Sequence, residues 1–515
     1  MNLLKKTIFL LFIGVFVLTS CKKEKENLQL SAIPADVFYV FAFENQKMIK
    51  KGGLDNLSEY ELFQKLQEEM DDNLEPGAKK IFEEFLKNPK SAGLDIEKMY
   101  IYGNMEGYGM YNIMNFKLDS RSTFEKKMKD FAESQDEDLP EITEEGGVKM
   151  ILADRNFVIA WSEDLLLMFS GQIGSLDYKS YFDLPADQSI LSVDDFATFQ
   201  KDSYDIGMWI SYGTLLSSVG EMMTATMPAY ASELKDAYVH GYVNFNDGEI
   251  KAIGRVSPQS KYEDLMKKFP IMKGNIDPAL LGDFPDKSFF LASISVNWAE
   301  YVKLLVDQFN QIGMYEDMLN DPAVQTIIDI VGGDLLFSIY NFAQDQLPIP
   351  LAGLSFTLQK DGDFERLLGL FPEGALTKNG DYYEIPTPAG VSINVGYKDK
   401  RVFITDDTEA IKSFFGGGFS PNLKDGVVAN ELKTSPSVIY MNLDLETYPD
   451  NIRGLITGFA TGMAKAALKF IEPMKDVSCY NNEKGEVIFS LKFKDSKRNS
   501  LKTLLKSIDE LASQM

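Results

Sequence analysis

One pattern of apolar and polar positions recurs along the chain. In residues 237–269, two runs rich in β-branched and aromatic residues flank Asp247-Gly248, and apolar side chains then follow at helical spacing from Tyr262 to Phe269. Residues of the first kind favour strands. Asp-Gly favours a two-residue hairpin, because such turns need positive φ. The pattern therefore predicts a strand, a tight turn, a second strand and an amphipathic helix.

Four pairs of stretches match between the first and second parts of the chain, in the same order and 236 to 251 residues apart. Ordered matches at a nearly constant spacing indicate an internal repeat. The sequence predicts an α+β fold, formed by tandem duplication of a mainly antiparallel sheet-plus-helices unit. The matched stretches are the opening strands at 33–43 and 284–294, the strand and helix at 111–131 and 351–371, the hairpins at 157–170 and 393–406, and the hairpins around Gly248 and Gly485.

The first 20 residues have the pattern of a secretory signal peptide. Two lysines precede an apolar run at residues 7–18, and Leu-Thr-Ser comes directly before Cys21. This ending resembles the bacterial lipobox, whose cysteine is acylated and becomes the new N-terminus. The apolar run is shorter than the ~20 residues that a membrane-spanning helix needs. We therefore expect a signal peptide at 1–20 and lipidation of Cys21.

The remaining boundaries follow from charged and structure-breaking residues. A mixed Lys/Glu run after Cys21 predicts a solvated tether. Breakers at Gly274, Pro278 and Gly282 mark the next boundary. The predicted organisation is a tether at 21–30, a first α+β half at 31–275 and a second α+β half at 276–515.

The charge balance limits the choice of partners. The chain has 77 acidic and 52 basic residues, a net charge of −25. Binding to a nucleic-acid backbone depends on clustered Lys and Arg, so this acidic protein is not expected to bind nucleic acid. The expected partner is the membrane, through the N-terminal lipid anchor. An envelope protein, a glycan and a lipid all stay open as further partners, and so do the membrane face and the oligomeric state.

The lipobox, the opening Ile-Pro-Ala-Asp at residues 33–36 with the apolar strand after it, and the chain length together resemble one family. That family comprises Bacteroidetes lipoproteins catalogued as domain of unknown function 4836. The resemblance covers most of the chain. It implies a cell-envelope location as an outer membrane lipoprotein, and it supplies no catalytic residue.

Residues that commonly carry catalysis are scarce. His240 is the single histidine, so a catalytic triad or a zinc cluster would have to use it alone. With Cys21 acylated, Cys479 is the one free thiol, and a buried structural position is expected for it. We expect no catalytic site, no metal and no cofactor, and the sequence does not locate a binding site.

Carboxylates are too numerous for their count alone to exclude acid–base chemistry. The adjacent pairs Asp194-Asp195 and Asp406-Asp407 are the most conspicuous. Both pairs are expected to close strand-like runs, where Asp commonly makes turn hydrogen bonds. We therefore interpret them as structural.

Glycines recur every four residues at Gly454, Gly458 and Gly462. On a single helix they would line one face and allow a close neighbour. The sequence therefore predicts a tightly packed helix here. An apolar groove for a partner or a lipid is the alternative.

These observations predict a non-catalytic, lipid-anchored protein of the cell envelope that binds or scaffolds at the outer membrane. Two alternatives stay open. A periplasmic carrier of an apolar ligand or lipid would need an apolar cavity. A carboxylate-dependent glycan hydrolase would need two acids lining one cleft.

Overall fold

The computed structural model describes residues 26–54, 56–106, 109–135, 139–174, 176–218, 236–257, 271–302, 321–343, 349–387, 391–459, 462–482 and 484–512. The predicted signal peptide and Cys21 lie outside these residues. The chain forms two compact units. Unit 1 holds residues 1–227, 232–261 and 495–515, and unit 2 holds 228–231 and 262–494.

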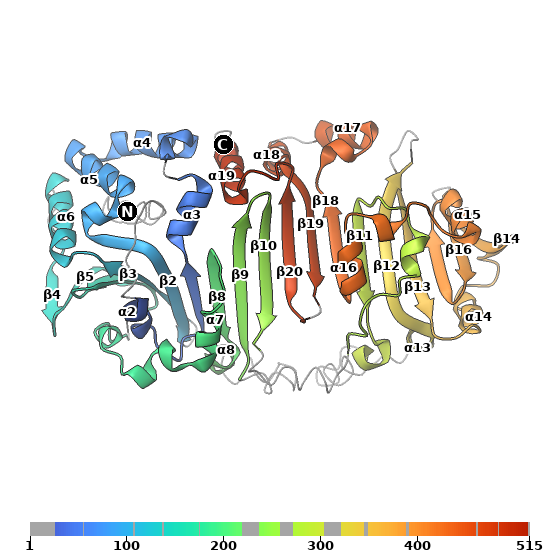
Figure 1. Cartoon of the computed structure of the whole chain (residues 1–515), viewed down its shortest axis with the longest axis horizontal. Helices are drawn as coiled ribbons and strands as arrows, with labels where there is room; N and C mark the ends of the chain where they lie inside the picture. Colours follow the sequence, from blue (N-terminus) through green and yellow to red (C-terminus); the bar gives the residue numbers. More distant parts are fainter. Residues whose placement is uncertain are drawn as a thin grey trace. The chain divides into compact units, whose positions relative to one another are not determined.

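Unit 1 is an antiparallel sheet with helices on both faces (Figure 1). In the order of their hydrogen-bonded pairing, its strands are β4 (Ile142–Glu145), β5 (Val148–Asp154), β6 (Phe157–Trp161), β7 (Leu165–Gly171), β3 (Gly109–Leu118), β2 (Leu94–Glu106), β1 (Tyr39–Phe43), β8 (Ile206–Ser211), β9 (Tyr238–Asn246) and β10 (Glu249–Val256). Its described helices include α2 (Glu26–Ser31), α3 (Asn45–Gly52), α4 (Glu61–Asn73), α5 (Pro76–Lys87), α6 (Arg121–Ser134), α7 (Asp194–Phe199), α8 (Tyr212–Ser218) and α19 (Ser500–Ala512).

The two faces of this sheet bury separate apolar clusters. Successive strand residues point to opposite faces. On β3, Ile113 therefore joins the cluster that also holds Leu30 of α2 and Phe196 of α7. Phe116 joins the opposite cluster, which includes Phe124 of α6. The helices α2 and α7 thus lie on one side of the sheet and α6 on the other.

Helix α19 packs in unit 1 although it ends the chain. The Ser500 hydroxyl donates to the Glu249 carbonyl at 2.9 Å. The Asp509 carboxylate accepts from the backbone N–H groups of Glu61 and Leu62 at 2.9 and 2.6 Å, which caps the start of α4. The compact units therefore differ from the predicted halves, because residues 495–515 belong with unit 1.

Unit 2 is also an antiparallel sheet. In pairing order its strands are β14 (Thr377–Asn379), β15 (Tyr382–Pro386), β16 (Ser392–Lys398), β17 (Arg401–Thr405), β13 (Pro350–Leu358), β12 (Val331–Phe342), β11 (Phe290–Ser295), β18 (Ser437–Asn442), β19 (Met474–Asn481) and β20 (Val487–Phe493). The described helices of this unit include α13 (Pro322–Ile330), α14 (Asp363–Leu368), α15 (Thr408–Gly416), α16 (Ala429–Thr434), α17 (Asp450–Phe459) and α18 (Met463–Ile471).

The two sheets have the same strand order, with β1 to β10 corresponding in turn to β11 to β20. Each pair of matched sequence stretches lies at corresponding places. Gly248 and Gly485 both sit in hairpin turns with positive φ, at 69° and 76°. The α+β fold with mainly antiparallel pairing is confirmed. Its origin in a tandem duplication stays a prediction.

Several local predictions were wrong. Helix α2 begins at Glu26 and buries Leu30, so the last part of the predicted tether at 21–30 belongs to the fold. The glycine repeat does not form one packed helix, because Gly462 has a positive φ of 52° and lies just before the start of α18. Gly454 and Gly458 are exposed, with open space beside them. Among the described residues, no helix is long and apolar enough to cross a membrane.

Candidate binding pocket

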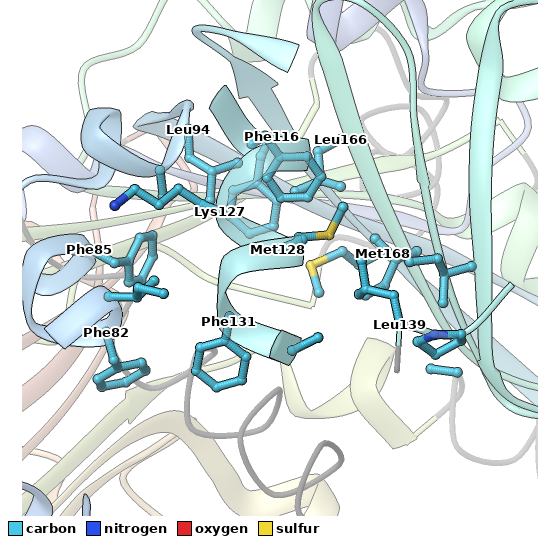
Figure 2. Close-up of a pocket in the computed structure, with 18 of the residues that line it drawn as sticks. Phe82, Phe85, Leu94, Phe116, Lys127, Met128, Phe131, Leu139, Leu166 and Met168 are labelled. Carbon is cyan, nitrogen blue, oxygen red and sulfur yellow. The ribbon is translucent and has the colours of Figure 1, made fainter. Parts of the chain in front are cut away.

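An apolar pocket with a volume of about 180 Å³ lies in unit 1, between helices α5 and α6 and one face of the sheet (Figure 2). Its walls come from segments far apart in the sequence. They are Ile81, Phe82, Phe85, Ala92, Leu94, Ile96, Phe116, Phe124, Lys127, Met128, Phe131, Ala132, Leu139, Pro140, Ile151, Ala153, Ile159, Leu166 and Met168.

Helix α6 supplies one wall of the pocket. It starts after Ser120, whose hydroxyl accepts from the backbone N–H of Thr123 at 3.2 Å and so satisfies one free donor of the first turn. Phe124, Met128 and Phe131 then recur at spacings of four and three residues, which places them on one helix face. The amphipathic pattern of α6 thus turns an apolar stripe toward the sheet.

Helix α5 supplies the second wall. Pro76 occupies its first turn, where a missing N–H breaks no hydrogen bond. Phe82 and Phe85 are three residues apart, both buried, and their ring centroids are 6.4 Å apart. Figure 2 shows these rings on the opposite side of Phe131 from Met168. The pocket wall is therefore largely aromatic on the α5 side.

The sheet provides the floor, with side chains from β2, β3, β5, β6 and β7. Met168 of β7 and Met128 of α6 approach each other in Figure 2. Methionine is unbranched and polarizable, so it adapts to ligands of irregular shape. The two methionines thus give this part of the floor flexible side chains.

A charged network fixes α6 to the strands next to the pocket. The Trp161 indole N–H donates to Glu125 at 2.9 Å, and Arg121 and Lys149 pair with the same carboxylate at 2.8 and 2.9 Å. Burial raises the pKa of Glu125, but the hydrogen bonds from Trp161, Arg121 and Lys149 outweigh it and lower the pKa from 4.5 to about 2. The ionised carboxylate therefore holds the helix to β5 and β6.

Lys127 is the one charged residue among the described lining residues. Its Nζ lies 2.8 Å from Glu84 Oε2 on α5. The Lys127 side chain is 25% exposed and the Glu84 side chain 41% exposed. The apolar stem of Lys127 thus lines the pocket while its ammonium group stays at the solvent boundary.

The conspicuous acid pairs lie elsewhere. Asp194 and Asp195 begin helix α7, so the prediction that they close a strand was wrong. Asp406 and Asp407 do follow strand β17, and Asp407 caps helix α15 by accepting from Glu409 N–H at 2.9 Å. The described pocket lining contains no carboxylate, so the pocket does not provide the two acids of a glycan hydrolase.

His240 lies in a buried network of unit 1. Its Nε2 is 2.7 Å from Asp195 Oδ1, which also accepts from the Trp209 indole N–H at 2.9 Å. The Ser257 hydroxyl donates to Asp195 Oδ2. In a catalytic triad the serine would face the histidine, so this arrangement differs from one. It fixes α7 to strands β8 and β9.

Burial raises the pKa of Asp195, but the hydrogen bonds from His240 and Ser257 outweigh it, so the net shift is downward. The remaining thiol, Cys479, is half-buried on β19, opposite Phe489 of β20. In the part of the chain that the structure describes, no three His, Cys, Asp or Glu residues gather in a group that could hold a metal ion.

A family model described as "Domain of unknown function (DUF4836)" matches residues 30–501. The chain belongs to the DUF4836 family. The matched region includes both units' sheets and the whole pocket lining of this DUF4836 protein. No curated protein and no solved structure matches the chain.

The pocket residues were not predicted from the sequence. The available signal was a pair of neighbouring helices, each with phenylalanines on one face: Phe82 and Phe85 on α5, and Phe124 and Phe131 on α6. Such a signal is weak, because the same pattern describes any helix that packs on a core.

Proposed function

We propose that this DUF4836 protein is a non-catalytic outer membrane lipoprotein that binds a small apolar ligand in the pocket between α5 and α6. The secretory pattern and Cys21 support the envelope location and the lipid anchor. The pocket supports binding rather than scaffolding alone. A ligand site of this kind is compatible with the predicted binding role. It is also compatible with the carrier alternative if the carried ligand is small.

The observation that carries the proposal is an apolar cavity in a structured region. Protein interiors are normally packed to crystal-like density, and unfilled apolar volume reduces stability. A dry apolar cavity of ~150 Å³ binds benzene or xenon. A pocket of about 180 Å³ therefore has room for an apolar group on the order of six to eight carbon atoms.

The volume also limits the carrier alternative. Pockets for drug-sized ligands measure roughly 300–1,000 Å³. A pocket of about 180 Å³ is too small for a whole membrane lipid with two chains. We therefore propose a small ligand, or a single apolar group of a larger molecule.

The position of α2 indicates how an acylated Cys21 would orient unit 1. Four residues lie between Cys21 and Glu26, so their Cα atoms are five residue steps apart and at most ~17 Å from each other. Helix α2 packs on the sheet face opposite the pocket: Gln29 and Asn115 exchange two hydrogen bonds there, and the next residue, Phe116, points into the pocket. Acylation of Cys21 would thus hold the sheet face that carries α2 nearest the bilayer. The pocket, on the opposite face, would be accessible to ligands from the aqueous side.

The ligand proposal is tested by closing the pocket. Calorimetry would measure octanol binding to the mature chain from residue 21, with Cys21→Ser to prevent acylation. Ala153→Phe on β5 places a ring in the pocket and is expected to reduce binding at least tenfold. Leu152→Phe is the matched control, because this neighbouring residue is 62% exposed and outside the lining. Equal binding by both variants would contradict the proposal.

The anchor is tested separately, by metabolic labelling with palmitate and membrane fractionation. The full-length protein is expected to take up the label and to sediment with membranes, and Cys21→Ser is expected to abolish both. An unlabelled full-length protein would refute the lipid anchor while leaving the pocket proposal intact.

A further inference from the structure

We infer that the ligand is a single-chain amphiphile whose carboxylate binds Lys127 and whose tail of about eight carbons fills the pocket. This inference rests on the proposed function, because it assumes that the pocket takes a ligand. It adds the chemical class of that ligand and the residue that recognises its polar end.

The placement of charge gives the first argument. The pocket is lined by apolar side chains except at Lys127, whose stem runs from α6 toward Phe85 of α5 in Figure 2. Apolar pockets commonly orient their ligands through a few polar groups. The Lys127 ammonium group is a single positive charge where the apolar lining meets solvent. It therefore favours a ligand that has an anionic head group and an apolar tail.

Glu84 gives the second argument, because its carboxylate already occupies part of the proposed head-group position. An ammonium group has three donors, and Glu84 takes one of them at 2.8 Å. The hydrogen bond and the charge of Lys127 lower the pKa of Glu84, so this ammonium group stabilises a carboxylate at the pocket edge. The Glu84 side chain is 41% exposed, so an incoming carboxylate can share the Lys127 ammonium group with Glu84 or take the place of Glu84.

The pocket walls give the third argument. The tail faces five phenylalanines, Phe82, Phe85, Phe116, Phe124 and Phe131, together with two methionines, Met128 and Met168. None of these side chains has a strong hydrogen-bond donor. A volume of about 180 Å³ accommodates one chain rather than two. The expected class is therefore a medium-chain carboxylate such as octanoate.

A chain-length series tests the tail. Calorimetry on the mature Cys21→Ser chain would compare carboxylates of four to twelve carbons. Each added methylene is expected to tighten binding about fourfold while the tail fills the pocket, and the gain should stop near eight carbons. A gain that continues to twelve carbons would overturn the assignment of a closed, single-chain pocket.

The head group is tested by comparing octanoate with octanol. Lys127→Met keeps an apolar stem, and it is expected to weaken octanoate about tenfold while changing octanol less than twofold. Glu84→Gln removes the competing carboxylate and is expected to tighten octanoate severalfold. Lys129→Met is the matched control, because Lys129 lies on the same helix, is 68% exposed and pairs with Glu133.

The outcomes separate this inference from the proposed function. If octanol and octanoate bind equally and neither Lys127→Met nor Glu84→Gln changes the ratio, the pocket is a ligand site but the head-group assignment is wrong. If neither compound binds to the parent chain, the proposed function fails together with the inference. Glu84→Gln retains Lys127, so it gives an answer even if Lys127→Met does not fold.

Discussion

The two units have the same strand order, but the helices that follow corresponding strands differ. After β3, unit 1 has the long helix α6, Arg121–Ser134, whereas after β13 unit 2 has the short helix α14, Asp363–Leu368. Phe124 and Phe364 hold the matched positions. Phe124 meets Trp161 edge-on, at a centroid distance of 5.7 Å and an angle of 76°, whereas Phe364 stacks on Tyr397 at 4.7 Å and 11°.

The polar atoms of the two partner rings explain part of this difference. The buried Trp161 indole N–H donates a hydrogen bond to Glu125 on α6. The Tyr397 hydroxyl instead donates to Asp361, before α14 begins, and Glu365 is exposed. The stacked pair packs in the apolar cluster beside α14, whereas Phe124 of the edge-on pair lines a pocket. The helices that cover the corresponding sheets therefore differ in length and in the ring contacts that they make.

The largest expected effect comes from removing the matched phenylalanines. Phe364→Ala should destabilise the protein by about 3–5 kcal/mol, because the ring stacks within a packed cluster. Phe124→Ala should cost about 2 kcal/mol less, because this ring already lines a cavity and the part of its surface that faces the cavity has no packing to lose. Denaturant unfolding of both variants measures the difference. A larger loss for Phe124→Ala would contradict the contrast between a packed and a hollow site.

The next effect comes from the charged network that fixes α6. Glu125→Gln should cost about 2 kcal/mol at neutral pH, after allowance for the carboxylate's partial exposure. The Glu125 pKa is lower in the folded state, so its stabilisation is complete above pH 4.5 and is lost as the pH falls toward 2. The gap between the parent and the variant should therefore close over this range.

Unfolding measured from pH 7 to pH 2.5 provides the check. Glu365→Gln is the matched control, because this residue is exposed, and it should change stability by less than ~0.5 kcal/mol at any pH. A loss for Glu125→Gln that stays constant with pH would show that the carboxylate contributes through shape rather than charge.

The smallest effect comes from adding volume. Ala132→Leu extends a buried α6 side chain into the pocket, so stability should stay within about 1 kcal/mol of the parent. Ala410→Leu extends a buried α15 side chain in the core of unit 2 and should cost about 1–3 kcal/mol. Thermal unfolding of the two variants compares them. Equal losses would indicate that the pocket is not available space.

Much of the fold was predictable from the sequence because its signals are local. Gly248 and Gly485 permit the positive φ of tight hairpins, and both hairpins formed as expected. The match of Phe124 with Phe364 placed two helices correctly after their strands. The pairing of β1 with β8 carried no such signal, because it joins Phe41 to Met208 across more than a hundred residues.

For the same reason, local sequence patterns could not predict that α19 packs in unit 1, and they could not predict the pocket. Asp509 has an ordinary helical sequence context, and only the fold brings it to the start of α4. The pocket needs Phe85, Phe131 and Met168 to meet from two helices and a strand. Each of these residues alone is typical of a core side chain, so spacing could not show that they leave space between them.

Xenon binding tests most directly whether unit 1 holds an open apolar site. A crystal of residues 21–515 with Cys21→Ser, pressurised with xenon, should show xenon between α5 and α6, lined by Phe124 and Met168, because xenon occupies dry apolar cavities of this size. The space beside Phe364 and Tyr397 should stay empty. A pocket without xenon, or filled by side chains of the protein itself, would contradict the account.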